Sequence, residues 1–191
     1  MRLGILGGSF DPPHIGHLLA AVDAYEALGL DRLFFVPAHT QPLKAGLATA
    51  PAHQRLAMVR LLIGSDDRFA VDAVEIDRAG LSFTVDTLKA FAQRFPDAER
   101  FFLIGEDAMT AFGEWRDPEQ ILRLARLAIL RRPGAKDGQR AELPAGTIAL
   151  ATRLVDVSST EIRQRVRDGR SIRGFVPESV AAFIETERLY R

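Results

Sequence analysis

The chain has 191 residues, 47% of them hydrophobic, which suffices for one compact core, so we expect a single domain over residues 1–191. Its 25 basic and 25 acidic residues give a formal net charge of zero, which argues against broad, salt-dependent binding to nucleic acid. Cysteine is absent and no apolar run approaches the roughly 20 residues of a membrane helix, so we expect a cytoplasmic protein without disulfides, thiolate chemistry or membrane contact.

The first third of the chain alternates apolar runs with stretches of helical spacing. Arg2–Leu6 is an apolar run that ends at two glycines, as a buried strand does. Helical spacing then extends to Leu28, where Gly29 is placed to cap the helix. The same reasoning predicts a strand over 33–36 that Pro37 ends, a loop over 38–50 that is a candidate to move on binding, and a helix from Pro51 that buries Leu56, Val59, Leu62 and Ile63.

The rest of the chain continues this alternation. Predicted strands lie at Phe69–Ile76, Phe101–Ile104, Leu127–Leu130, Thr147–Leu150 and Leu154–Val157. Predicted helices lie at Thr84–Arg94, 107–112 and 117–125, and two more begin near Thr160 and Pro177, while residues 132–146 form a surface loop. The pattern predicts a doubly wound, Rossmann-like α/β fold with a mostly parallel sheet, in which ligands bind where the strand order reverses.

The most informative segment joins the first strand to the first helix and reads Gly7-Gly8-Ser9-Phe10-Asp11-Pro12-Pro13-His14-Ile15-Gly16-His17. Its two leading glycines let backbone amides approach a phosphate closely. His14 and His17 would lie on one side of the first helical turn, where imidazoles gain nothing from the helix dipole unless an anion binds there. Either histidine alone is compatible with an ordinary surface position, whereas the whole string favours phosphate binding.

A second segment reads Val157-Ser158-Ser159-Thr160-Glu161-Ile162-Arg163. Ser158 and Glu161 have the spacing of a capping box, and a well-made helix start would explain that spacing by itself. Arg163, however, is a cation in the first turn, where the bare helix disfavours one. Hydroxyls, free amides and an arginine together would hold a triphosphate.

These two segments resemble the nucleotidyltransferase superfamily marked by GG-[ST]-F-D-P-x-H-x-G-H and by an hSSTxIR element. The resemblance implies a fold that binds ATP with Mg²⁺, with His14 and His17 on the ATP phosphates and Arg163 assisting them. The other ATP-binding residues that it implies in these segments are Gly7, Gly8, Ser9, Phe10, Ser158, Ser159 and Thr160.

The middle of the chain is similar to bacterial nicotinate-nucleotide adenylyltransferases at Ser82–Thr84, Phe101–Asp107, Trp115 and Arg131–Gly134, so the resemblance covers nearly the whole length. It implies that Trp115 stacks on a pyridine ring, that Thr84 receives its carboxylate, that Gly105 and Asp107 contact ATP, and that Lys44 assists at the phosphates. Each has an ordinary alternative: Trp115 in the core, Thr84 and Asp107 as helix caps, Lys44 as a solvated cation. We hypothesise that Arg116 favours nicotinate over nicotinamide.

The implied activity is adenylyl transfer from ATP to nicotinate mononucleotide, a step of NAD biosynthesis that gives deamido-NAD and pyrophosphate. Mg²⁺ is expected to be held mainly by ATP and water, with no protein ligand bound directly and Asp11 as an outer-shell candidate. The alternatives are transfer to nicotinamide mononucleotide or phosphopantetheine, and a module that binds ATP without turnover. A homo-oligomer is possible.

Overall fold

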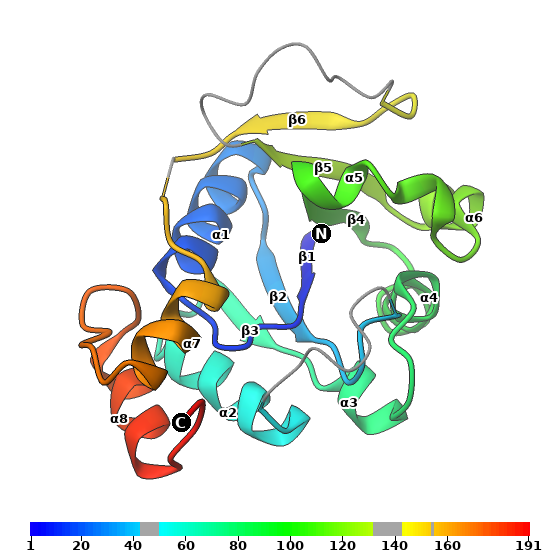
Figure 1. The fold of residues 1–191 in the computed structure, drawn as a ribbon. Coiled ribbons are helices and arrows are strands. Elements are labelled where there is room, and N and C mark those ends of the chain that lie inside the picture. The colour runs from blue at the N-terminus through cyan, green and yellow to red at the C-terminus, as the bar shows by residue number, and fades with distance from the viewer. Residues whose placement is uncertain (43–49, 132–142, 154) are drawn as a thin grey trace.

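A computed structural model describes residues 1–42, 50–131, 143–153 and 155–191. Its strands form one fully parallel sheet in the order β3-β2-β1-β4-β5-β6 (Figure 1). The strands are β1 (Arg2–Gly8), β2 (Arg32–Pro37), β3 (Phe69–Val71), β4 (Glu99–Gly105), β5 (Arg126–Arg131) and β6 (Ile148–Ala151). This arrangement confirms the predicted doubly wound α/β fold, because the order runs outward from the centre in both directions.

The order reverses between β1 and β4, which are paired from Arg2 with Glu99 to Leu6 with Leu103. Beyond these pairs, β1 ends at Gly8 and β4 ends at Gly105. Ligands of doubly wound sheets bind beyond the carboxyl ends of strands at such a reversal. The glycine-rich loop predicted from the sequence therefore begins at the place where this fold binds its ligands.

Helices cover both faces of the sheet. One face carries α1 (Ile15–Leu28), α2 (Ala52–Ile63), α7 (Ser159–Arg167) and α8 (Glu178–Thr186) (Figure 1). The other carries α3 (Val74–Arg78), α4 (Thr84–Arg94), α5 (Glu106–Met109), η2 (Phe112–Glu114) and α6 (Pro118–Leu124). Alternate residues of β4 enter the two cores, Phe101 and Leu103 on the first face, Phe102 and Ile104 on the second. No helix in the described parts of the chain is long and apolar enough to span a membrane.

Several predicted helix ends are confirmed. Gly29 caps α1 with φ 55°, in the left-handed region that suits glycine. The side chain of Ser158 caps α7 by accepting a hydrogen bond from the backbone N–H of Glu161 at 3.1 Å. The helix at Thr84–Arg94 has the predicted bounds, and Leu88 and Phe91 are fully buried in it.

Other predictions for the chain are wrong. The strand predicted at Phe69–Ile76 stops at Val71, and residues from Val74 form α3. An Asp72 carboxylate oxygen accepts from the N–H of Val74 at 3.0 Å and so satisfies one of the donors that a helix start leaves without an intrahelical partner. Residues 155–157 form no strand.

In α2, Leu56 of the predicted inner face is only half-buried, whereas the half-buried Ile63 does pack against the core. Arg55 and Met58 are buried instead, beside the correctly predicted Val59 and Leu62. The buried face of α2 is therefore turned relative to the predicted one and includes Arg55.

Candidate active site

The loop after β1 is packed around Phe10. Phe10 has φ 49°, in the left-handed region that bulky residues rarely adopt, and its ring is 2% exposed. A β-carbon on Gly8 would come within 3.0 Å of this ring, so residue 8 has to be small. Because the ring belongs to the core, a contact between Phe10 and ATP would come from the Phe10 backbone.

Two histidines lie side by side at the start of α1. Their ring centroids are 3.8 Å apart, and His17 Nδ1 accepts a hydrogen bond from the His14 backbone N–H at 3.2 Å. Since Nδ1 accepts, a neutral His17 ring carries its hydrogen on Nε2, which is then the donating nitrogen. A β-carbon on Gly16 would lie 3.0 Å from His14 Nδ1. The glycine between the two histidines thus makes room for an imidazole.

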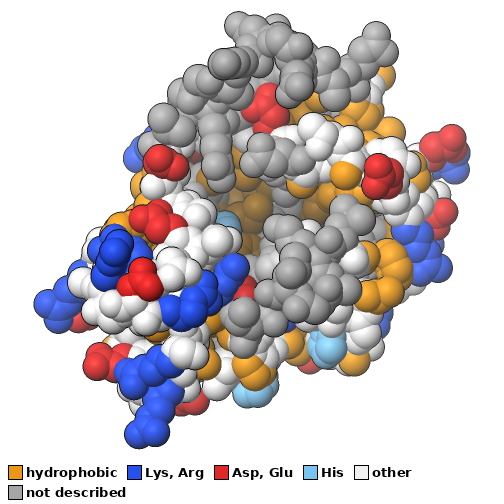
Figure 2. All heavy atoms as spheres, in the orientation of Figure 1, with side chains coloured by type: hydrophobic (Ala, Val, Ile, Leu, Met, Phe, Trp, Pro, Cys, Tyr) orange, Lys and Arg blue, Asp and Glu red, His pale blue; other side chains and the backbone are white. Residues whose placement is uncertain are grey.

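The first turn of α7 is hydrogen-bonded to the loop that precedes these histidines. Ser159 Oγ donates to the carbonyl of Pro12 at 2.8 Å, and Arg163 Nη1 donates to the carbonyl of Asp11 at 2.7 Å. Arg163 Nη2 also donates to Thr160 Oγ1 at 3.2 Å. The two segments are therefore neighbours in space, although the bonded residues are 147 and 152 positions apart in the sequence. Figure 2 shows Lys and Arg side chains gathered over α7 and α8, beside a hollow with hydrophobic side chains at its floor.

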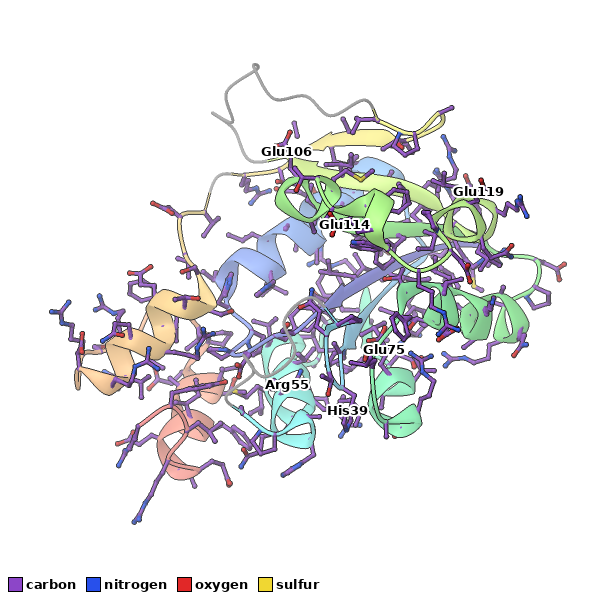
Figure 3. The ribbon with its side chains drawn as sticks, turned by 45° about the vertical axis from the view of Figure 1, so that its right-hand side comes forward. His39, Arg55, Glu75, Glu106, Glu114 and Glu119 are labelled. Carbon is purple, nitrogen blue, oxygen red and sulfur yellow. The ribbon has the colours of Figure 1, made fainter. Side chains whose placement is uncertain are left out.

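Arg55, on the buried side of α2, joins the loop after β1 to both ends of the loop between β2 and α2. It is 2% exposed, and its guanidinium donates to the carbonyls of Ser9 at 2.6 Å, His39 at 2.8 Å and Ala50 at 3.1 Å (Figure 3). Burial lowers the pKa of Arg55, and the nearby charge of Asp11 acts against that shift. The ends of β1 and β2 are thereby fixed relative to each other.

On the other face of the sheet, Trp115 follows η2 and packs against two phenylalanines. Its ring centroid is 5.6 Å from that of Phe112 and 6.1 Å from that of Phe102. The indole is only half-buried as a residue, yet Nε1 is buried and has no hydrogen-bond partner among the residues that the structure describes. Trp115 is therefore partly core, with a polar atom that packing alone does not satisfy.

Arg116 lies over the start of α4. Its guanidinium carbon is 4.9 Å from the ring centroid of Phe83, and Nη1 is 3.7 Å from an Asp86 carboxylate oxygen. Thr84 is half-buried and is the first residue of that helix. Arg116 thus contacts Phe83 and Asp86, which flank Thr84 at the start of α4. The predicted substrate-binding residues Thr84 and Arg116 therefore lie at the same helix start.

Glu75 is a buried carboxyl next to the same helix. It is 7% exposed, accepts from Thr87 Oγ1 at 2.5 Å, and is also hydrogen-bonded by the side chain of Ser82. Ser82 Oγ in turn accepts from the N–H of His39 at 2.9 Å, and the Ser82 N–H donates to the carbonyl of Thr40 at 2.8 Å. Burial raises the pKa of Glu75, with the two hydroxyls acting against it. This carboxyl therefore ties α3, α4 and the residues after β2 together.

Part of the predicted site lies outside the described residues. Lys44, the segment 132–134 and the side chain of Asp107 are not described. The backbone of Asp107 is described and belongs to α5. Ser9 Oγ donates to Gln41 Oε1 at 2.7 Å. Within the described ranges, no three His, Cys, Asp or Glu side chains gather as metal ligands.

The buried residues that the sequence analysis did not single out include Arg55, Glu75 and Tyr190. Arg55 shares the helical stripe of Met58 and Leu62, and an arginine on an apolar stripe is a pattern that could have found it. Glu75 and Tyr190 have no comparable pattern, because their burial depends on partners distant in the sequence.

Comparison with known proteins decides the family. Residues 5–165 match the family model described as cytidylyltransferase-like. A probable nicotinate-nucleotide adenylyltransferase of Gemmatimonas aurantiaca is 53% identical over 197 residues, which cover 100% of this chain and 93% of the relative. The chain belongs to the nicotinate-nucleotide adenylyltransferase branch of the cytidylyltransferase-like family. A probable member of the same branch from Thermus thermophilus is 44% identical over 191 residues, 100% of both chains.

The family membership confirms the resemblance drawn from the two phosphate-binding segments and the middle of the chain. A solved structure of Plasmodium falciparum nicotinic acid mononucleotide adenylyltransferase complexed with NaAD is 18% identical to this chain. Its TM-score is 0.77, over 99% of this chain and 97% of that chain. At that identity the likeness establishes a shared fold.

Proposed function

We propose that this protein transfers the AMP portion of ATP to nicotinate mononucleotide, giving deamido-NAD and pyrophosphate. The observation that carries the proposal is the direct joining of α7 to the loop before His14 and His17, through Ser159 and Arg163. Two helix amino ends thereby meet beside the reversal of strand order, and each favours an anion. Family membership supplies the reaction, since the relatives are described as nicotinate-nucleotide adenylyltransferases.

The reaction requires alignment more than proton transfer. A 5′-phosphate has its second pKa near 6, so it is already an anion near neutral pH and can attack the α-phosphorus of ATP without a base. The new P–O bond forms in line with the breaking bond, whose electron pair leaves on pyrophosphate. We assign His14, His17 and Arg163 to the charge that builds on the α- and β-phosphates, with Lys44 assisting.

ATP would lie across the ends of β1 and β4. In this assignment the backbone of the loop after β1 and the start of α7 hold the phosphates, and the start of α5 holds the ribose. The residues are Gly7, Gly8, Ser9, Phe10, Ser158, Ser159 and Thr160 for the phosphates, and Gly105 and Asp107 for the ribose. Mg²⁺ enters as part of the MgATP substrate, held largely by phosphate oxygens and water.

Nicotinate mononucleotide would occupy the other end of the site. The half-buried Trp115 stacks on the pyridine ring, and Thr84 with the amino end of α4 receives the carboxylate. Arg116 stands beside that helix start, where its charge favours nicotinate over neutral nicotinamide. Cytoplasmic location and a homo-oligomer remain predictions.

Pyrophosphate release on mixing the protein with MgATP and one acceptor at a time tests the proposal. The acceptors are nicotinate mononucleotide, nicotinamide mononucleotide and phosphopantetheine, and the first is expected to give the highest kcat/KM. A higher value with another acceptor would replace the substrate named here. ATP binding without pyrophosphate release for any acceptor would instead identify a nucleotide-binding module.

A further inference from the structure

The last residues of the chain return to the loop that precedes the two histidines. After α8, Arg188 has φ 51° and Tyr190 has φ 64°, both in the left-handed region that side chains other than glycine adopt at a cost. The N–H of Leu189 donates to the carbonyl of Ile184 at 3.0 Å. This conformation brings the penultimate side chain back into the protein, where Tyr190 is 7% exposed.

The Tyr190 hydroxyl is held on one atom of the loop after β1. It donates to Asp11 Oδ1 at 2.8 Å, and the N–H of Ala50 donates to the same oxygen at 3.2 Å. Asp11 is itself 4% exposed, three residues before His14. Burial raises the pKa of Tyr190 well above its usual range, so the phenol stays protonated and remains a donor.

Asp11 therefore accepts hydrogen bonds from two elements that are distant in the sequence. Its carboxylate is bound by the C-terminal Tyr190, and its carbonyl accepts from Arg163 of α7 at 2.7 Å. The neighbouring Pro12 carbonyl accepts from Ser159 at 2.8 Å. Arg163 and Ser159 are assigned to the phosphates, whereas the hydrogen bond of Tyr190 goes to the Asp11 carboxylate.

We propose that Tyr190 is a positioning residue for adenylyl transfer: its hydroxyl holds the Asp11 carboxylate and so fixes the segment that delivers His14 and His17 to the polyphosphate. The inference rests on the proposed adenylyl transfer and deepens it. A displacement of about 1 Å at a reacting group can lower turnover by on the order of 10²-fold. Loss of this one hydroxyl is therefore expected to lower kcat, while the KM for nicotinate mononucleotide changes little because the pyridine end lies on the other face of the sheet.

The Tyr190→Phe variant tests this with the ring, and hence the packing, retained. The chain has only one other tyrosine, Tyr25, which packs on Phe69 and Arg68, so Tyr25→Phe is a matched control. Assays run well below each variant's Tm should give a kcat about tenfold or more below wild type for Tyr190→Phe, and an unchanged kcat for Tyr25→Phe. A Tyr190→Phe kcat within twofold of wild type would overturn the inference.

A second measurement is independent of the Tyr190→Phe variant. In Tyr25→Phe, Tyr190 is the only phenol left, so the near-ultraviolet absorbance of tyrosinate reports on it alone. We expect no tyrosinate until the protein unfolds in alkali; ionisation of the folded protein near the ordinary pKa of about 10 would refute the buried hydroxyl–carboxylate bond. If wild type releases no pyrophosphate, the proposed function fails, whereas an active wild type equalled by Tyr190→Phe refutes this inference alone.

Discussion

The phosphate end of the site is fixed by hydrogen bonds between distant parts of the chain, whereas the pyridine end is shaped by aromatic packing. Asp11 is bonded to Arg163, 152 residues away, and to Tyr190, 179 residues away. At the other end, Trp115 packs on Phe112 and Phe102, and Arg116 makes an exposed ion pair at 3.7 Å. Directional bonds fix a geometry, while packing of the half-buried Trp115 on the buried rings of Phe102 and Phe112 fixes mainly a surface.

This difference implies that substitutions at the two ends should change different kinetic constants. An interaction made mainly in the transition state lowers kcat when it is lost, and an interaction made equally in the ground state raises KM. The phosphate end, where charge builds during the reaction, belongs to the first class. The pyridine end, where nothing reacts, belongs to the second.

The largest effect is expected for His17→Ala. Loss of the Nε2 donor should lower kcat by on the order of 10²–10³, as for other donors that stabilise developing charge. The exposed His53 on α2 provides the control, since His53→Ala should leave kcat unchanged. Steady-state pyrophosphate release measures both, and a His17→Ala protein that is folded and fully active would remove His17 from the mechanism.

Next in size is the effect of Trp115→Leu on the acceptor. Stacking of an aromatic side chain on a base is worth about 1–3 kcal/mol, so the KM for nicotinate mononucleotide should rise about tenfold or more with kcat much less affected. Trp115→Phe should restore part of the loss. Because Trp115 is the only tryptophan, its fluorescence should also change when wild type binds nicotinate mononucleotide. An unchanged KM in the Leu variant would assign Trp115 to the core alone.

Glu75→Gln should change how stability depends on pH. A carboxyl whose pKa is raised on folding binds protons more tightly in the folded state, so its contribution is present at low pH and is lost as pH rises through the folded pKa. From the ordinary glutamate pKa of about 4.3 upward, the unfolding free energy of wild type should therefore fall relative to that of Glu75→Gln. Urea denaturation at several pH values measures the difference, with the exposed Glu119→Gln as control (Figure 3). A difference that is constant over this range would contradict the burial argument.

The smallest effect is expected for Arg116→Ala. Its guanidinium is 55% exposed and shared with Asp86, so its influence on a substrate carboxylate is worth at most about 1 kcal/mol. The ratio of kcat/KM for nicotinate over nicotinamide mononucleotide should fall about two- to fivefold. Arg123→Ala on α6, 70% exposed, should leave the ratio unchanged. If Arg116→Ala leaves it unchanged too, Arg116 has no part in the preference.

Features set by neighbouring residues could be predicted from the sequence, whereas features set by distant partners could not. The helix at Thr84–Arg94 and the cap at Ser158 were predictable, because their patterns lie within a few residues of each other. The short helix at Val74–Arg78 was not, since its Glu75 is buried against hydroxyl donors of Thr87 and Ser82 that lie outside the helix.

Within the site, local chemistry marked the strings containing the histidines and Arg163 as candidates, and the family resemblance gave them their roles. Tyr190 could not be found in this way, because it binds a loop that only the folded chain brings to it. The apolar stripe of α2 could have indicated that Arg55 is buried, but not the carbonyls to which it donates. Tertiary partners decide whether a polar residue can be buried, and such partners leave little trace in the pattern of neighbouring residues.

The central claim is that the helix amino ends of α1 and α7 hold one polyphosphate between them. A crystal structure of the protein with a non-hydrolysable ATP analogue and Mg²⁺ measures this most directly. The account predicts that His17 Nε2 and the Arg163 guanidinium, or the N–H of Ser159, lie within hydrogen-bond distance of the same triphosphate. A triphosphate bound away from α7, or away from both histidines, would contradict it.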